Sequence, residues 1–100
     1  MALQGDHGKP RPALVVQSDL DALVSSHVAV LPLTSVVTDT PLLRIPIQAT
    51  PATGLAITSF AMLDRMTTAD RQKISRVIGH VDTATMLEVS RAIAVFLGIA

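Results

Sequence analysis

The sequence predicts an α+β domain that is mostly a small antiparallel barrel or strongly bent sheet, closed by one C-terminal helix. Short apolar, β-branched segments follow one another along most of the chain, separated by stretches rich in Gly, Pro, Ser and Thr. The last segment has helical periodicity instead. Because 100 residues are enough for one core and too few for two, we expect a single domain over residues 1–100.

The first half of the chain predicts a loop and two buried strands. Residues 5–12 contain two glycines and two prolines, which indicates a loop. The β-branched run 13–17 indicates a buried strand, and residues 18–21 can open a short helical turn. A second apolar strand is expected at 28–33.

The middle of the chain predicts a half-buried strand, a turn and further strands. Residues 42–48 alternate apolar and polar side chains, and Pro46 places this strand at an edge or a bulge. Residues 50–54 read Thr-Pro-Ala-Thr-Gly, which is typical of a turn. The following segment, 55–63, can hold one or two short strands.

The C-terminal third ends in the helix. Residues 67–72 predict a short helix capped by either threonine at its start, and 74–79 predict another short strand. Asp82 is a good N-cap for a helix over 83–97, and Gly98 fits the residue after its end. One face of this helix is apolar, which suits a core or a dimer interface: Met86, Val89, Ile93, Phe96 and Leu97.

Composition excludes several classes of protein. An apolar content of 49% with 16% charged residues excludes a disordered chain, and no apolar stretch approaches the length of a transmembrane helix. The absence of cysteine excludes disulfides and thiolate metal sites, and it fits a reducing cytosol. Eight basic and eight acidic residues give zero net charge, so any anion site must be a local patch. With two Phe and neither Trp nor Tyr, there is little material for base stacking.

The most unusual segment holds an arginine between two prolines, at Pro10-Arg11-Pro12. The prolines fix φ on both sides and stiffen the chain as it enters the strand. A guanidinium held in this way suits bidentate capture of a phosphate or a carboxylate. The alternative is a solvated arginine beside turn prolines, and composition alone favours this alternative.

Four segments, in the same order, resemble the MazF/PemK (Kid) toxin family. The first is 8–19 (Gly-Lys-Pro-Arg-Pro-Ala-Leu-Val-Val-Gln-Ser-Asp), and the second is 30–35 (Val-Leu-Pro-Leu-Thr-Ser). The third comprises Gly54-Leu55 and the stretch 59–65, and the fourth is 78–82 with the helix that follows. The resemblance extends over nearly the whole chain.

The resemblance implies a toxin of a type II toxin–antitoxin system, acting in the bacterial cytoplasm. Family members are sequence-specific endoribonucleases of single-stranded RNA that need no metal or other cofactor. The 2′-hydroxyl attacks the adjacent phosphate and leaves a 2′,3′-cyclic phosphate and a 5′-hydroxyl. The implied fold is an SH3-like barrel with a C-terminal helix, and the implied partners are a second copy, an antitoxin and RNA. Two alternatives stay open: a DNA gyrase poison like the related CcdB branch, and a truncated relic that only binds its antitoxin.

The resemblance also implies the site residues. Arg11 matches the arginine that binds the scissile phosphate or transfers a proton, and Thr34 matches the hydroxyl that contacts the same phosphate. His7 is either a proton-transfer group or a solvated loop histidine. Asp64 matches an acid that binds substrate or acts in acid–base chemistry, with a structural cap as the alternative. Weaker candidates for substrate binding are Lys9, Ser35, Ser59 and Arg65.

Two positions depart from the family pattern. The Kid branch has an arginine two residues before the acid, where this chain has Met62, so Arg65 or Lys9 would have to supply the second cation. Residues 1–4 alone precede the 5–12 loop, so the first strand is expected to be shortened. His27 and His80 are expected to be structural or solvated, since no third ligand stands at metal spacing.

Overall fold

The computed structural model describes residues 2–4, 10–16, 26–36 and 43–99. Within these residues the chain forms a seven-stranded sheet, two short 3-10 helices and an α-helix. The strands are β1 (Ala2–Gln4), β2 (Pro10–Val15), β3 (His27–Thr34), β4 (Arg44–Ile47), β5 (Ser59–Met62), β6 (Thr67–Asp70) and β7 (Ile74–Arg76). The helices are η2 (Leu63–Arg65), η3 (Arg71–Lys73) and α2 (Thr83–Leu97).

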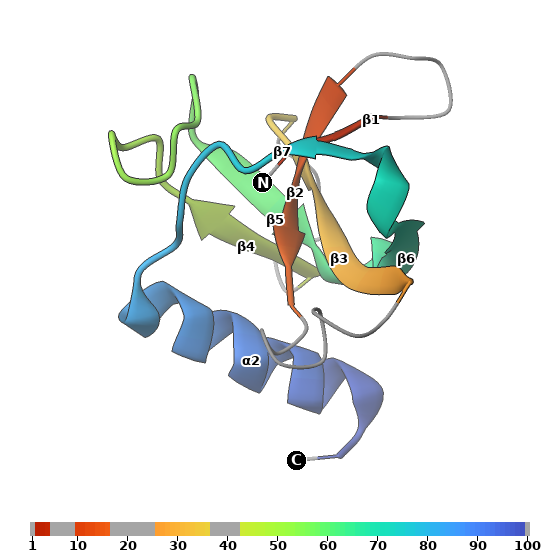
Figure 1. The fold of residues 1–100 in the computed structure, drawn as a ribbon. Coiled ribbons are helices and arrows are strands. Elements are labelled where there is room, and N and C mark those ends of the chain that lie inside the picture. The colour runs from red at the N-terminus through yellow and green to blue at the C-terminus, as the bar shows by residue number, and fades with distance from the viewer. Residues whose placement is uncertain (1, 5–9, 17–25, 37–42, 100) are drawn as a thin grey trace.

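The sheet is antiparallel and strongly bent. Its hydrogen-bonded order is β4-β5-β3-β2-β1-β7, and β6 pairs with β3 beside this path. Residues 10–12 of β2 pair with β1, whereas residues 13–15 pair with β3. β3 likewise pairs with β6 at its start and with β5 at its end. These changes of partner fold the sheet around itself, and α2 lies along one side of it (Figure 1). The predicted architecture, mainly β with a C-terminal helix, is confirmed.

The strand predictions at 42–48 and 55–63 are confirmed in shorter form. β4 ends the pairing path of the described strands with β5 as its neighbour, so Pro46 does lie on an edge strand, where proline is tolerated. Ile45 and Ile47 are buried, as the alternating pattern predicted. β5 is the strand formed within 55–63.

Two predicted boundaries are wrong. β2 begins at Pro10, so the loop expected over 5–12 ends earlier, because a proline is tolerated at the first residue of a strand. Residues 67–70 form β6 and not the start of a short helix. Pairing with residues 27–30 of β3 overrides the capping signal, and β-branched Thr67 and Thr68 suit a strand. The turn expected at 18–21 lies outside the described residues.

Residues 2–4, where a shortened first strand was expected, form β1. This strand pairs with β2 on one side and with β7 on the other. β7 covers the first half of the strand expected at 74–79. The N-terminal segment is therefore an interior strand of the sheet.

Two hydrophobic clusters hold the described residues together. The larger lies between the sheet and α2, and its buried members are Leu31, Ile45, Ile47, Ala61, Leu63 and Val89. The smaller lies beneath β2, β3 and β6, with Ala13, Val28 and Val30 at its centre. Burial of these aliphatic side chains is the main source of stability, since the chain has so few aromatic residues.

α2 has the predicted bounds and end signals. Asp82 is the N-cap residue, and Gly98 follows the helix with φ of 75° and donates to the Val95 carbonyl at 3.1 Å. Val89 is buried against the sheet, but the last turn projects away from it: Val95, Phe96, Leu97 and Ile99 are exposed. None of the helices in the described part of the chain is long and apolar enough to cross a membrane.

Candidate active site

Arg11 and Thr34 stand at matching positions of β2 and β3, two residues beyond the last pair that these strands form. The paired residues of these strands are Val15↔Val30, Leu14↔Leu31 and Ala13↔Pro32. Continuing this count by two residues on each strand sets Arg11 opposite Thr34. Residues at matching positions of an antiparallel pair project from the same side of the sheet. The register therefore joins two residues that are 23 positions apart in the sequence.

The same row continues across β5 to β4. Thr34 pairs with Phe60, and Phe60 pairs with Pro46. The next row of side chains on this side contains Met62 and Arg44, which also pair. We call this surface the Thr34 face, formed by Arg11, Thr34, Phe60, Pro46, Met62 and Arg44. The opposite side of β4 and β5 carries the buried Ile45, Ile47 and Ala61 and faces the core.

The two polar groups of this row are available to a ligand. Arg11 is exposed, and no hydrogen bond or ion pair joins its guanidinium to another described residue. Thr34 is half-buried, and its Oγ1 accepts a hydrogen bond from the Val36 amide at 3.2 Å. A hydroxyl that accepts one bond still has its own hydrogen to donate. This face of the sheet therefore carries an exposed cation on β2 and, on β3, a hydroxyl with a hydrogen left to donate.

Arg44 of β4 supplies the second cation of this face, and the sequence reasoning missed it. Its Nη1 forms an ion pair with Asp64 Oδ1 and also donates to the Leu43 carbonyl at 3.1 Å. The Arg44 side chain is 12% exposed and that of Asp64 is 34% exposed. Arg44 lies across from Met62, the position where the Kid branch has its arginine. Neither Arg65 nor Lys9 is needed to place a cation beside Asp64.

The alternating pattern at 42–48 was the available signal for Arg44. That pattern put Arg44 on the outer side of a half-buried strand, opposite Ile45 and Ile47. It could not show which residue of another strand Arg44 faces, because this depends on the register of β4 with β5. Asp64 follows β5 in η2, 20 residues away in sequence.

The weaker candidates fall in different places. Ser35 is exposed directly after Thr34, and Arg65 is exposed beside Asp64. Ser59 is buried, on the core side of β5, and its hydroxyl donates to the Ile57 carbonyl at 3.0 Å. This placement argues for a structural role of Ser59 and against contact with a substrate. His7 and Lys9 lie outside the described residues.

Neither of the described histidines belongs to the Thr34 face. His27 begins β3, next to β6, with its Nδ1 3.1 Å from Ser26 Oγ. The His80 amide donates to the Ala52 carbonyl at 2.8 Å, which ties the segment before α2 to the 50–54 turn. Among the described residues, no three His, Asp or Glu side chains gather as metal ligands would.

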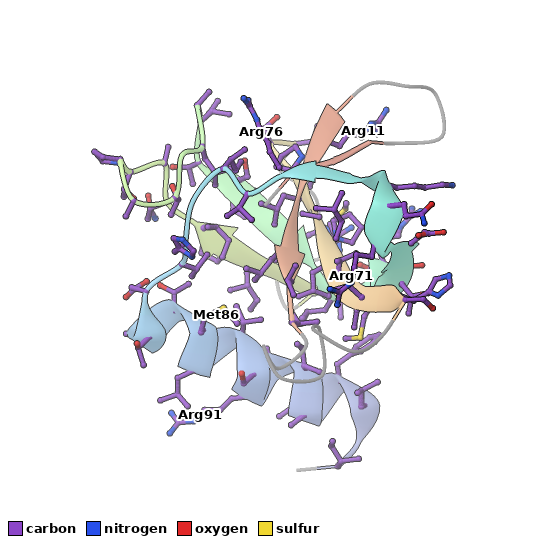
Figure 2. All side chains as sticks on the ribbon, viewed as in Figure 1. Arg11, Arg71, Arg76, Met86 and Arg91 are labelled. Carbon is purple, nitrogen blue, oxygen red and sulfur yellow. The ribbon has the colours of Figure 1, made fainter. Side chains whose placement is uncertain are left out.

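Exposed arginines mark the end of the sheet that contains Arg11. Arg11 of β2 and Arg76 of β7 both project at the end of the molecule away from α2, whereas Arg91 lies on the outer side of that helix (Figure 2). All three side chains are exposed. A chain with zero net charge therefore still has a local cationic surface at one end.

A small, bent antiparallel sheet with one C-terminal helix defines the structural class of this chain. Similarity to known proteins identifies the family within this class. A model of the PemK-like, MazF-like toxins of type II toxin–antitoxin systems matches residues 1–97, so the chain belongs to that family. The resemblance inferred from the four sequence segments is thus confirmed.

Individual relatives agree with this assignment. The chain is 48% identical over 94 residues to the probable endoribonuclease MazF of Mycolicibacterium smegmatis, covering 93% of this chain and 84% of that protein. The fold is similar to Mycobacterium tuberculosis toxin MazF-mt6, with a TM-score of 0.85 and 23% identity over 99% of this chain and 95% of that one. It also resembles a mycobacterial endoribonuclease solved with its cognate antitoxin, with a TM-score of 0.76 and 23% identity over 99% and 88% of the two chains. These comparisons favour neither the gyrase poison nor the relic.

Proposed function

We propose that this chain is the toxin of a toxin–antitoxin pair and cleaves single-stranded RNA at a short sequence, without a metal ion. The observation that carries the proposal is the position of Arg11 opposite Thr34 in the continued register of β2 and β3. Membership of the MazF-like family supports it, as does the name of the 48% identical relative, a probable endoribonuclease. The reaction would take place in the bacterial cytoplasm.

Cleavage proceeds by transfer of the phosphate within the RNA chain. The 2′-oxygen of one nucleotide forms a bond to the neighbouring phosphorus, and the bond from phosphorus to the 5′-oxygen of the next nucleotide breaks. The 2′-hydroxyl loses a proton, and the departing 5′-oxygen gains one. Negative charge builds up on the non-bridging oxygens in between. Arg11 and Thr34 stabilise that charge by donating hydrogen bonds to these oxygens.

Proton transfer needs a second group close to the phosphate. Asp64 lies four residues beyond Phe60, two of them in β5 and two in η2, which puts it on the order of 10 Å along the chain from the Thr34 row. This separation suits contact with a neighbouring nucleotide better than proton transfer at the phosphate. His7, close to Arg11 in sequence, is therefore our candidate for proton transfer.

The remaining polar candidates extend the site along the RNA. Lys9 and Arg65 would contact phosphates on either side of the cleaved bond, and Ser35 would donate a hydrogen bond beside Thr34. Arg44 holds the Asp64 carboxylate in place and leaves its second oxygen for a base N–H. Ser59 is omitted from this set because of its burial.

Two protein partners complete the proposal. The exposed apolar last turn of α2 and its continuation to Ile99 suit burial against a second copy of the chain. An antitoxin would bind across the Arg11 region with an acidic segment, in competition with RNA. A mycobacterial relative of the same fold has been solved with its cognate antitoxin.

A cleavage assay on a long, defined RNA in EDTA tests the function directly. We expect cuts at one short sequence, with 2′,3′-cyclic phosphate and 5′-hydroxyl ends. Cleavage should weaken as salt rises, because phosphate contacts release counterions. Cleavage that requires added metal, or products with 5′-phosphate ends, would overturn the mechanism.

A further inference from the structure

Phe60 is an aromatic side chain on the sheet that serves neither hydrophobic cluster. It is half-buried on the Thr34 face, on the side of β5 opposite the core. Many half-buried apolar side chains pack against the clusters of the described residues, and Phe60 is not one of them. A phenyl ring that contributes to no described core is available for another contact.

The neighbours of Phe60 are defined by two strand pairings. Thr34 lies opposite it on β3, and the exposed Pro46 lies opposite it on β4. Met62 follows two residues later on the same side of β5. The ring therefore sits in a small apolar surface, with the hydroxyl of Thr34 on one side and the proline ring on the other.

We propose that Phe60 stacks against a nucleobase next to the phosphate held by Arg11 and Thr34. This inference rests on the proposed function and adds a base-binding subsite to it. The chain has two phenylalanines and neither Trp nor Tyr, so Phe60 is the aromatic residue that the sheet offers for such a contact. The sequence alone suggested that little material for base stacking exists, and the register shows where one such residue lies.

The spacing of the strands supports this arrangement. Neighbouring strands lie about 4.8 Å apart, so Phe60 is one strand spacing from Thr34, and β2, which carries Arg11, is the next strand on the other side of β3. A base is joined to its phosphate through a single ribose. A nucleotide with its phosphate between Arg11 and Thr34 can therefore lay its base over β5. Every base has a flat π-face, so this contact holds the strand with little sequence preference of its own.

Substitutions at Phe60 should change RNA binding in a pattern that depends on ring chemistry. Phe60→Leu keeps an apolar side chain but removes stacking, and we expect about a tenfold higher KM with a smaller effect on kcat. Phe60→Tyr keeps the ring and should restore the wild-type KM. Leu87→Ala removes an exposed apolar side chain from α2 and should leave cleavage unchanged.

Abasic RNAs identify the base concerned. We consider a set of substrates, each lacking one base near the cut. The cleavage efficiency of wild type should fall by about tenfold for the substrate that lacks the stacked base. On the substrate that lacks this base, Phe60→Leu should cleave as efficiently as wild type, because the contact between ring and base is already absent. If Phe60→Leu keeps the wild-type melting temperature but cleaves every substrate, intact or abasic, less efficiently than wild type by the same factor, the proposal is overturned.

Fluorescence separates this subsite from the cleavage reaction. Phe60→Trp introduces a sole tryptophan, and a single-stranded RNA with 2′-deoxyribose at the attacked nucleotide should quench it. If wild type cuts no RNA, a random pool of short RNAs takes the place of this probe. Leu87→Trp, on α2, is the control and should not respond.

The outcomes distinguish the two proposals. Quenching without cleavage would support the subsite and reject the nuclease. Cleavage that is indifferent to Phe60→Leu, with no quenching of Phe60→Trp, would reject the subsite and retain the nuclease. A response of Phe60→Trp to an acidic antitoxin peptide but not to RNA would make this surface a protein-binding site and would also reject the stacking proposal.

Discussion

Arg44, on the Thr34 face, forms an ion pair with Asp64, which follows β5 in η2. The guanidinium is largely buried, with its Nε lacking a hydrogen-bond partner among the described residues, and the carboxylate is about one-third exposed. Removing Asp64 leaves this buried cation without its counterion, which is the costly direction for a buried pair. Loss of Asp64 alone should therefore destabilise this edge of the sheet, and the pair orients a carboxylate at the proposed site.

Asp64→Ala should lower the free energy of unfolding by about 1–2 kcal/mol, a value reduced from that of a buried pair because Asp64 is partly exposed. Arg44→Met should lower the free energy of unfolding by less, because it removes the buried charge itself and leaves only the partly exposed Asp64 unpaired. Urea unfolding of both single variants and the double variant measures the coupling between them. Strictly additive effects would show that the pair contributes nothing to stability.

Gly54 is required by its backbone conformation and by a close neighbour. Its φ is +70°, and a Cβ at this position would lie 2.0 Å from the Ile78 carbonyl oxygen. Gly98 has a similar φ of +75°, but a Cβ there meets nothing within 4 Å. Gly98→Ala should therefore cost about 1 kcal/mol, and Gly54→Ala at least about 2 kcal/mol, measured by thermal unfolding. Equal costs would mean that Ile78 moves aside freely.

Val89 is the buried contact of α2 with the sheet. Its side chain is fully buried, whereas that of Val77, before the helix, is 57% exposed. Val89→Ala should lower the free energy of unfolding by about 2 kcal/mol, and the matched Val77→Ala change by less than about 0.5 kcal/mol. Denaturant unfolding compares the two. A small effect at Val89 would indicate that the helix does not depend on this contact for its position.

Thr34 should act through its hydroxyl. Thr34→Val keeps the shape and the strand propensity but removes the donor, so kcat for RNA cleavage should fall by about a hundredfold. Thr34→Ser keeps the hydroxyl and should retain most of the activity. Single-turnover cleavage measures both, and circular dichroism confirms their folding. Retention of full activity by Thr34→Val would remove this hydroxyl from the mechanism.

Local signals predicted the parts of the fold that local interactions determine. The helix over 83–97 was predicted with its bounds because the 3.6-residue period, Asp82 and Gly98 all act within the helix itself. Residues 67–72 were predicted as a short helix from the same kind of signal, and here pairing with β3 prevailed. An isolated threonine pair cannot indicate that a partner strand from a distant part of the chain will bind it.

The candidate site depends on the register in which β2, β3, β5 and β4 pair, and local sequence patterns do not determine that register. The resemblance selected Arg11, Thr34 and Asp64 because they stand at family positions. Arg44 was missed because its link to Asp64 depends on the alignment of β4 with β5. Phe60 was missed because only the folded chain shows that it lies outside both hydrophobic clusters. Ser59 was included because its position resembles the family, although its side chain points to the core.

Cleavage by wild type, Arg11→Ala and Arg91→Ala in EDTA tests the central claim most directly. Both variants lose one exposed arginine, but Arg91 lies on the outer side of α2, away from Arg11 (Figure 2). We predict that Arg91→Ala cuts the same RNA sequence at the wild-type rate and leaves 2′,3′-cyclic phosphate ends. Arg11→Ala should fold normally and lose about a hundredfold or more in kcat. A folded Arg11→Ala variant that cuts at the wild-type rate would contradict the assignment of Arg11 to the phosphate.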